Sequence, residues 1–252
     1  VVPAMQIVAH RVAWACLFVL AWMAMRGELA GLRAILARRD LLLRLAAAAV
    51  LISINWLAYV WGVSSGRVVE TSLGYFINPL LNVVIGVVFL RERLLPAQWV
   101  AVALAACGVL WLTFNYGSFP WIAMALAGSF ALYGLIRRQA QVDAVAGLGV
   151  ENLYLLVPAA VLLGWLELNG AGGFADLGWG RGTNLLLVLG GALTALPLIG
   201  FAYAVRRVSL STVGLLHYLA PTLQLLCGVL VGSIFEVQHA ESFGDGQDPS
   251  DH

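Results

Sequence analysis

Long blocks of apolar residues recur along this chain and restrict its fold more than any other feature of the sequence. Clusters of Arg, Pro, Gly or Asn separate eight such blocks, at about residues 9–26, 44–65, 71–90, 97–114, 119–136, 148–166, 183–205 and 211–234. As helices, blocks of this length cross a hydrocarbon core roughly 30 Å thick. We therefore predict an all-α integral membrane protein with about eight transmembrane helices.

The composition is incompatible with a water-soluble domain. Hydrophobic residues make up 62% of the 252 residues, and charged residues only 11%. A soluble protein of this length needs a larger charged surface. Cys16, Cys107 and Cys227 lie inside apolar blocks, so we interpret them as packing residues rather than as a metal site or a disulfide framework.

All 14 basic residues are Arg, and their distribution predicts an orientation in the membrane. One set of alternate loops has 11 of them: Arg26, Arg33, Arg38, Arg39, Arg44, Arg91, Arg93, Arg137, Arg138, Arg206 and Arg207. The other set has only Arg11, Arg67 and Arg181. Because cationic loops stay in the cytoplasm, we predict that loop 26–44 is cytoplasmic. We expect the Arg11 and Arg67 side chains to extend to the outer interface.

Two segments of the chain resemble each other. Aligning "YFINPLLNVVIG" (75–86) with "HYLAPTLQLLCG" (217–228) pairs Pro79 with Pro221 and Asn82 with Gln224. By the Arg distribution the two copies cross the membrane in opposite directions, which indicates inverted repeats and is typical of transporters. We predict a first repeat over residues 1–118, a second over 119–235, and a disordered acidic tail over 236–252.

The two prolines occupy equivalent places in these copies. Proline has no N–H, so each leaves the carbonyl four residues earlier without its helical bond, roughly 12–15 Å into its span. A bare carbonyl in lipid costs several kcal/mol, so it must face protein or a wet cavity. We predict that Pro79 and Pro221 break their helices and line a central cavity. The alternative is a structural kink at each.

Polar and aromatic residues in these spans are the candidate solute-binding residues: Asn55, Tyr59, Tyr75, Asn78, Asn82, Tyr133, His217, Tyr218 and Gln224. For the amides the alternative is interhelical hydrogen bonding. For His217 two roles are open: coupling of transport to a proton, or a neutral hydrogen-bonding role. Glu151 opens the block 148–166, where we expect it to cap the helix, with a gate as the alternative. Such a cavity has almost no fixed charge and favours neutral, zwitterionic or amphipathic solutes.

The sequence has neither an HExxH motif nor a P-loop, two motifs typical of enzymes. We therefore predict a protein that is not an enzyme and uses neither a cofactor nor a metal. An intramembrane enzyme acting on a lipid-linked substrate is the alternative, and it needs acids, His or a nucleophile clustered at one membrane face.

The segment "ETSLGYFINPLLNVVIGVVFLRERL" (70–94) closely resembles RarD-like members of the EamA family in the drug/metabolite transporter superfamily. "AHRVAW" (9–14), "INWLAYVWGV" (54–63) and "LSTVGLLHYLAPTLQLL" (210–226) fit the same family in the same order. The resemblance implies ten helices in two inverted five-helix repeats, a central cavity, and transport by alternating access across the bacterial inner membrane.

The same resemblance implies that this chain lacks the family's first and last helices. Residues 1–118 then correspond to helices 2–5 of the family fold, and residues 119–235 to helices 6–9. A partial, inactive fragment of a transporter is therefore a further alternative. The implied partners are a small drug or metabolite and the lipid bilayer. A homodimer is left open, and nucleic acid is not expected.

Overall fold

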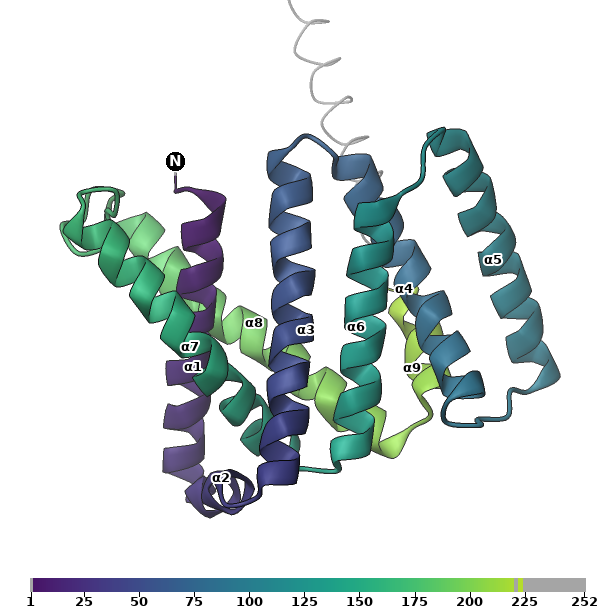
Figure 1. The fold of residues 1–252 in the computed structure, drawn as a ribbon, viewed down its shortest axis with the longest axis horizontal. Helices are drawn as coiled ribbons and strands as arrows, with labels where there is room; N and C mark the ends of the chain where they lie inside the picture. The colour runs from purple at the N-terminus through teal and green to yellow at the C-terminus, as the bar shows by residue number, and fades with distance from the viewer. Residues whose placement is uncertain (1, 220–221, 224–252) are drawn as a thin grey trace, which may run out of the picture. The chain divides into compact units, whose positions relative to one another are not determined.

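The computed structural model describes residues 2–219 and 222–223, and all regular elements in this part of the chain are helices (Figure 1). In chain order they are α1 (Ala4–Arg26), α2 (Leu29–Leu36), α3 (Arg39–Ser64), α4 (Val68–Val88), α5 (Pro96–Tyr116), α6 (Trp121–Ala140), α7 (Ala144–Leu168), α8 (Arg181–Arg207) and α9 (Leu210–His217). The chain divides into two compact units, Val1–Leu215 and Leu216–His252. The packing described below is that of the first unit.

In the second unit the structure describes residues 216–219 and 222–223. The carbonyl oxygen of Tyr218 accepts hydrogen bonds from the N–H and the hydroxyl of Thr222, at 3.3 and 2.7 Å. Pro221, Gln224 and the predicted tail at 236–252 lie outside the described residues.

Six of the described helices are long and apolar enough to cross a membrane, namely α1, α3, α4, α5, α7 and α8. Each corresponds to one of the predicted spans. The predicted span 119–136 forms α6, which is 20 residues long but includes Arg137 and Arg138 in its last turn. Most of the predicted span 211–234 lies outside the described residues. The structure therefore supports a multi-pass helical membrane protein.

Successive long helices of the first unit run in alternating directions (Figure 1). Four connections lie at the lower edge in this view, and they join α1 to α3 through α2, α4 to α5, α6 to α7, and α8 to α9. These are the loops predicted to be rich in Arg, so we name this end the Arg-rich edge. The opposite end, where α3 joins α4, α5 joins α6 and α7 joins α8, is the Arg-poor edge.

The core of this unit consists of two large groups of buried apolar side chains and two smaller ones, which join α4 to α6 and α1 to α7. One large group lies between α1, α2, α3, α7 and α8 and includes Val19, Met23, Leu45 and Leu148. The other large group joins α3, α4, α6, α8 and α9 and includes Ile52, Ile85, Phe201 and Leu210. Helix α5 packs mainly on α4 and has no buried residues, so its apolar surface is available to lipid.

Local signals explain where several helices begin and end. Gly27 and Gly117 follow α1 and α5 with φ angles of 69° and 76°, a left-handed conformation that glycine adopts without steric cost. The Asp143 carboxylate accepts hydrogen bonds from the N–H groups of Val145 and Ala146, at 2.9 and 3.1 Å, and caps α7. Our expectation that Glu151 caps this helix is therefore wrong, because α7 begins at Ala144, a full two turns earlier.

Helix α8 crosses α1 in direct backbone contact at Gly191. A Cβ atom at this position would lie 2.6 Å from the Ala15 nitrogen, closer than real Cβ atoms approach. At the neighbouring Gly190, the nearest atom to a Cβ would be Cγ of Arg11 at 3.7 Å, an ordinary contact. Only one of the two adjacent glycines is therefore required by packing.

We expect Gly191→Ala to lower the free energy of unfolding by about 1–3 kcal/mol, because the added methyl group pushes the backbones of α1 and α8 apart. Gly190→Ala is the matched control, and it should leave stability unchanged or raise it slightly, since alanine favours the helix. Unfolding of the detergent-solubilised protein in SDS measures both. Equal stabilities for the two variants would contradict the close crossing.

Candidate functional site

Side chains from four helices come together around Arg11 of α1. Its Nε donates a hydrogen bond to the Thr194 hydroxyl of α8 at 2.9 Å, and its guanidinium carbon lies 5.5 Å from the centre of the Trp56 ring of α3. The hydroxyl groups of Tyr59 on α3 and Tyr75 on α4 lie within electrostatic range of the same guanidinium. We name these five residues the Arg11 cluster.

The cluster lies within the thickness of the helical layer rather than at either edge. At 1.5 Å per residue, Arg11 lies about 10 Å from the start of α1, Tyr75 about 10 Å from the start of α4, and Tyr59 about 8 Å from the end of α3. All three helix ends are at the Arg-poor edge (Figure 1). The cluster is therefore about a third of the way through a bilayer-thick layer.

The prediction that Arg11 extends to the outer interface is wrong, because its side chain bonds across to α8. The Thr194 hydroxyl donates its own proton to the Gly190 carbonyl at 2.7 Å, so a lone pair on its oxygen is directed at Arg11. Arg67, by contrast, contacts the rings of Trp61 and Trp121 at the Arg-poor edge, as an interfacial residue would.

Two of the predicted site residues belong to this cluster. The rings of Tyr59 and Tyr75 meet edge-to-face with their centres 6.1 Å apart, and 36% and 53% of these residues remain exposed. Arg11, Trp56 and Thr194 were not predicted as site residues. An ionisable side chain inside an apolar block was the available signal for Arg11.

Helix α4 runs without interruption from Val68 to Val88, although Pro79 lies inside it. The predicted break at Pro79 is therefore not present. The loss of a single N–H does not end the helix, and α9 lies close to this region. A Cβ atom on Gly214 would lie 2.7 Å from the Pro79 carbonyl oxygen and 2.9 Å from Cβ of Asn82.

The predicted asparagines lie on faces that pack against other helices. Asn82 is fully buried and donates from its amide nitrogen to the Asn78 side-chain oxygen at 3.2 Å. Asn55 donates to the Leu126 carbonyl of α6 at 2.8 Å and to the Ser129 hydroxyl at 3.3 Å. Hydrogen bonding between and along helices is thus the observed arrangement for these three amides.

A buried ion pair joins α6 to α7 near the Arg-rich edge. Arg137 and Glu151 meet at 3.1 Å, and only 1% of each side chain is exposed. The predicted site residue Tyr133 donates its hydroxyl to the second Glu151 oxygen at 3.1 Å, and Arg137 also donates to the Ala144 carbonyl at 3.0 Å. The sequence analysis did not predict this pair: it placed Arg137 in a loop, because the predicted span ended at residue 136, and it expected Glu151 to cap a helix.

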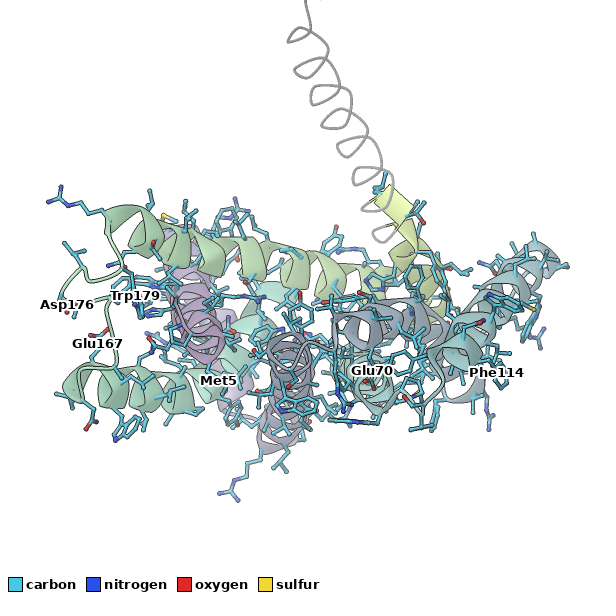
Figure 2. The ribbon with its side chains drawn as sticks, turned by 90° about the horizontal axis from the view of Figure 1, so that it is seen from above. Met5, Glu70, Phe114, Glu167, Asp176 and Trp179 are labelled. Atoms are coloured by element: carbon cyan, nitrogen blue, oxygen red, sulfur yellow. The ribbon has the colours of Figure 1, made fainter. Side chains whose placement is uncertain are left out.

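Two further carboxylates bind the first residues of neighbouring helices. Glu70, at the Arg-poor end of α4, accepts from the Ile122 N–H of α6 at 2.8 Å and from the Tyr116 hydroxyl at 3.0 Å. Figure 2 shows Glu70 enclosed among these helix ends. Glu92, beyond the Arg-rich end of α4, accepts from the N–H groups of Leu210 and Ser211 in α9 at 2.8 and 2.9 Å. Each carboxylate satisfies donors that a helix start leaves unbonded.

The predicted residues of the first unit thus fall into separate places. Tyr59 and Tyr75 lie together, Asn78 and Asn82 pair with each other, and Tyr133 belongs to the ion pair with Arg137. His217 and Tyr218 belong to the second unit, and Pro221 and Gln224 lie outside the described residues. Among the residues that the structure describes, no three His, Cys, Asp or Glu side chains gather as metal ligands would.

Comparison with known proteins agrees with a multi-pass membrane protein. Residues 1–114 match the model of the EamA-like transporter family. The chain is 46% identical over 228 residues to the protein RarD of Streptomyces exfoliatus, covering 90% of this chain and 71% of the relative. It is 41% identical over 240 residues to the uncharacterized transporter YojE of Bacillus subtilis strain 168, covering 91% and 76%.

A solved structure titled only "Crystal structure of protein" has the same fold, with a TM-score of 0.66 at 20% identity over 92% of this chain and 80% of that one. The fold and the relatives together define a helical membrane transporter. The chain belongs to the EamA-like transporter family and is similar to its RarD members.

We expect Glu151→Leu and Arg137→Met, made singly, each to lower the free energy of unfolding by about 3–5 kcal/mol, because each leaves one buried charge unpaired. The double variant should cost less than either single one. Asp40→Asn is the control, since the Arg38–Asp40 pair is 62% and 54% exposed and its loss should not measurably change stability. Single variants as stable as this control, in the same SDS unfolding assay, would contradict a buried pair.

Proposed function

We propose that this protein is a secondary transporter that moves a small organic solute, a drug or metabolite, across the bacterial inner membrane by alternating access. In this proposal the Arg-rich edge faces the cytoplasm, since cationic loops remain on that side. The observation that carries the proposal is the Arg11 cluster, a polar and aromatic group from four helices at membrane depth in a member of a transporter family.

Helix packing supports inverted repeats over residues 1–118 and 119–235. If the repeats are related by a two-fold axis in the membrane plane, α1 corresponds to α7 and α3 corresponds to α8. The two-fold axis then relates the contact between α1 and α8 to a contact between α7 and α3. The structure has both contacts. It also pairs helices of opposite direction, as inversion requires (Figure 1).

The carboxylate contacts support a mechanism with two gates. Glu70 bonds α4 to α6 at the Arg-poor edge, while Glu92 bonds the α4–α5 loop to α9 at the Arg-rich edge. A transporter that opens to one side at a time needs contacts at one edge to separate while those at the other hold. Hydrogen bonds to a carboxylate suit this role, because water replaces them when an edge opens.

We expect a cysteine at position 75 to react with a membrane-impermeant maleimide from both sides of the membrane, because alternating access exposes the Arg11 cluster to each side in turn. The experiment uses Tyr75→Cys in a chain whose Cys16, Cys107 and Cys227 are replaced by Ala, in right-side-out and inside-out vesicles. It requires no knowledge of the solute.

Leu104→Cys in the same background is the matched control. Leu104 lies in the middle of α5 and is 70% exposed on a helix with no buried residues, so we expect it to face lipid and to remain unmodified from either side. Modification of position 75 from one side only would contradict alternating access.

A further inference from the structure

The Arg11 guanidinium has no counter-charge in the described part of the chain. Within residues 2–219 and 222–223, no carboxylate lies within ion-pair distance of it, and the titratable groups that interact with it are the hydroxyls of Tyr59 and Tyr75. Arg137, the other arginine enclosed by helices, is paired with Glu151. Arg11 therefore differs from Arg137 in lacking an anionic partner.

The Arg11 cluster orients this cation and leaves its terminal nitrogens without hydrogen-bond acceptors among the described residues. Thr194 accepts from Nε, and the Trp56 ring lies against the guanidinium, so the side chain is held from two directions. No described residue accepts a hydrogen bond from either terminal Nη nitrogen. The pair of Nη donors presents the fork that binds a carboxylate through two parallel hydrogen bonds.

An unpaired cation at this depth is unfavourable, and an anion that arrives from outside the protein would relieve the cost. Charged side chains within a membrane are expensive unless they pair or face water. The same low dielectric environment strengthens an ion pair once its partner is present. Trp56, Tyr59 and Tyr75 add apolar ring surface and two hydroxyl donors beside the guanidinium, which suits an organic acid better than a small inorganic anion.

We propose that the Arg11 cluster binds the carboxylate group of an anionic or zwitterionic organic solute. Arg11 pairs with the carboxylate, while the rings of Trp56, Tyr59 and Tyr75 contact the apolar part of the solute. This assignment rests on the proposed transport function, for which it names the solute class. It replaces the cavity without fixed charge that the sequence led us to expect.

A phospholipid headgroup carries the same chemistry, since its phosphate also accepts two hydrogen bonds from a guanidinium. The assignment to a solute therefore needs a test that separates a lipid from a free acid. Arg11 is about 10 Å from the start of α1 at 1.5 Å per residue, deeper than the headgroup layer, which favours the free acid.

The test uses three probes with one aromatic skeleton and different charges: phenylacetate, phenylacetamide and phenethylamine. Equilibrium dialysis of each radiolabelled probe against the full chain in neutral detergent measures binding. We expect phenylacetate to bind at least about 10-fold more tightly than the amide or the amine, because a hydrogen bond between two charged groups is stronger than one with a neutral partner. Arg11→Gln should abolish this preference, while Arg11→Lys should keep part of it.

Arg67→Gln is the matched control, because Arg67 also lies on tryptophan rings near the Arg-poor edge, and the preference for phenylacetate should survive this change. If Arg11→Gln does not fold, Thr194→Val and Tyr75→Phe replace it, and each should weaken phenylacetate binding. Equal binding of the three probes, or a preference that persists in Arg11→Gln, would overturn the assignment. So would displacement of phenylacetate by added phosphatidylglycerol, which would give the site to a lipid headgroup.

The binding result and the cysteine labelling result are independent. A charge preference that depends on Arg11, with position 75 labelled from one side only, would keep the solute class and reject alternating access. Labelling from both sides without a charge preference would keep the transport mechanism and reject the carboxylate site.

Discussion

Hydrogen bonds to three carboxylates connect the helices of this protein and give their association a specificity that apolar contacts alone do not provide. Glu70 accepts from the start of α6, Glu92 accepts from the start of α9, and Glu151 accepts from Arg137 and Tyr133 of α6. In a bilayer, apolar side chains gain little by leaving lipid for protein, so specific polar contacts and close packing must determine which helices associate. The positions of α4, α6, α7 and α9 relative to one another depend on these bonds.

Close packing between backbones supplies the second requirement. Gly191 lets α8 cross α1 at backbone distance, and Gly214 lets α9 lie against the Pro79 carbonyl of α4. The first crossing places Thr194 beside Arg11, because Thr194 lies one turn beyond Gly190 and Gly191 on α8. The candidate site is thus a consequence of the same crossing that stabilises the fold.

Six of the eight predicted spans followed from local information and agree with helices that the structure describes. Block length and Arg placement sufficed for α1, α3, α4 and α5, because a helix in lipid satisfies its own backbone and needs no partner to be recognised. The site was less predictable. Tyr59 and Tyr75 were recognised as site residues. Arg11 was assigned to the interface, because a span that begins at residue 9 places Arg11 in its first turn. That helix starts at Ala4, five residues before the predicted span.

The partners of the polar residues could not be read from spacing along one helix. Asn55 and Tyr59 are one turn apart, yet one binds the backbone of α6 and the other contacts a ring of α4. Likewise, Glu151 would lie in the first turn of α7, where an acid caps a helix, only if α7 began at residue 148. Its actual partner, Arg137, lies 14 residues away on a different helix.

The sequence by itself determined that this chain is an all-α membrane protein, which apolar segments form its long helices, and which loops are rich in Arg. These properties depend on hydropathy, length and charge, which are set by residues that are close together along the chain. Only the tertiary structure decided which polar side chains meet, because a hydrogen bond or an ion pair requires two groups to lie within about 3–4 Å of each other. For Arg11 and Thr194, that distance depends on how α1 and α8 cross.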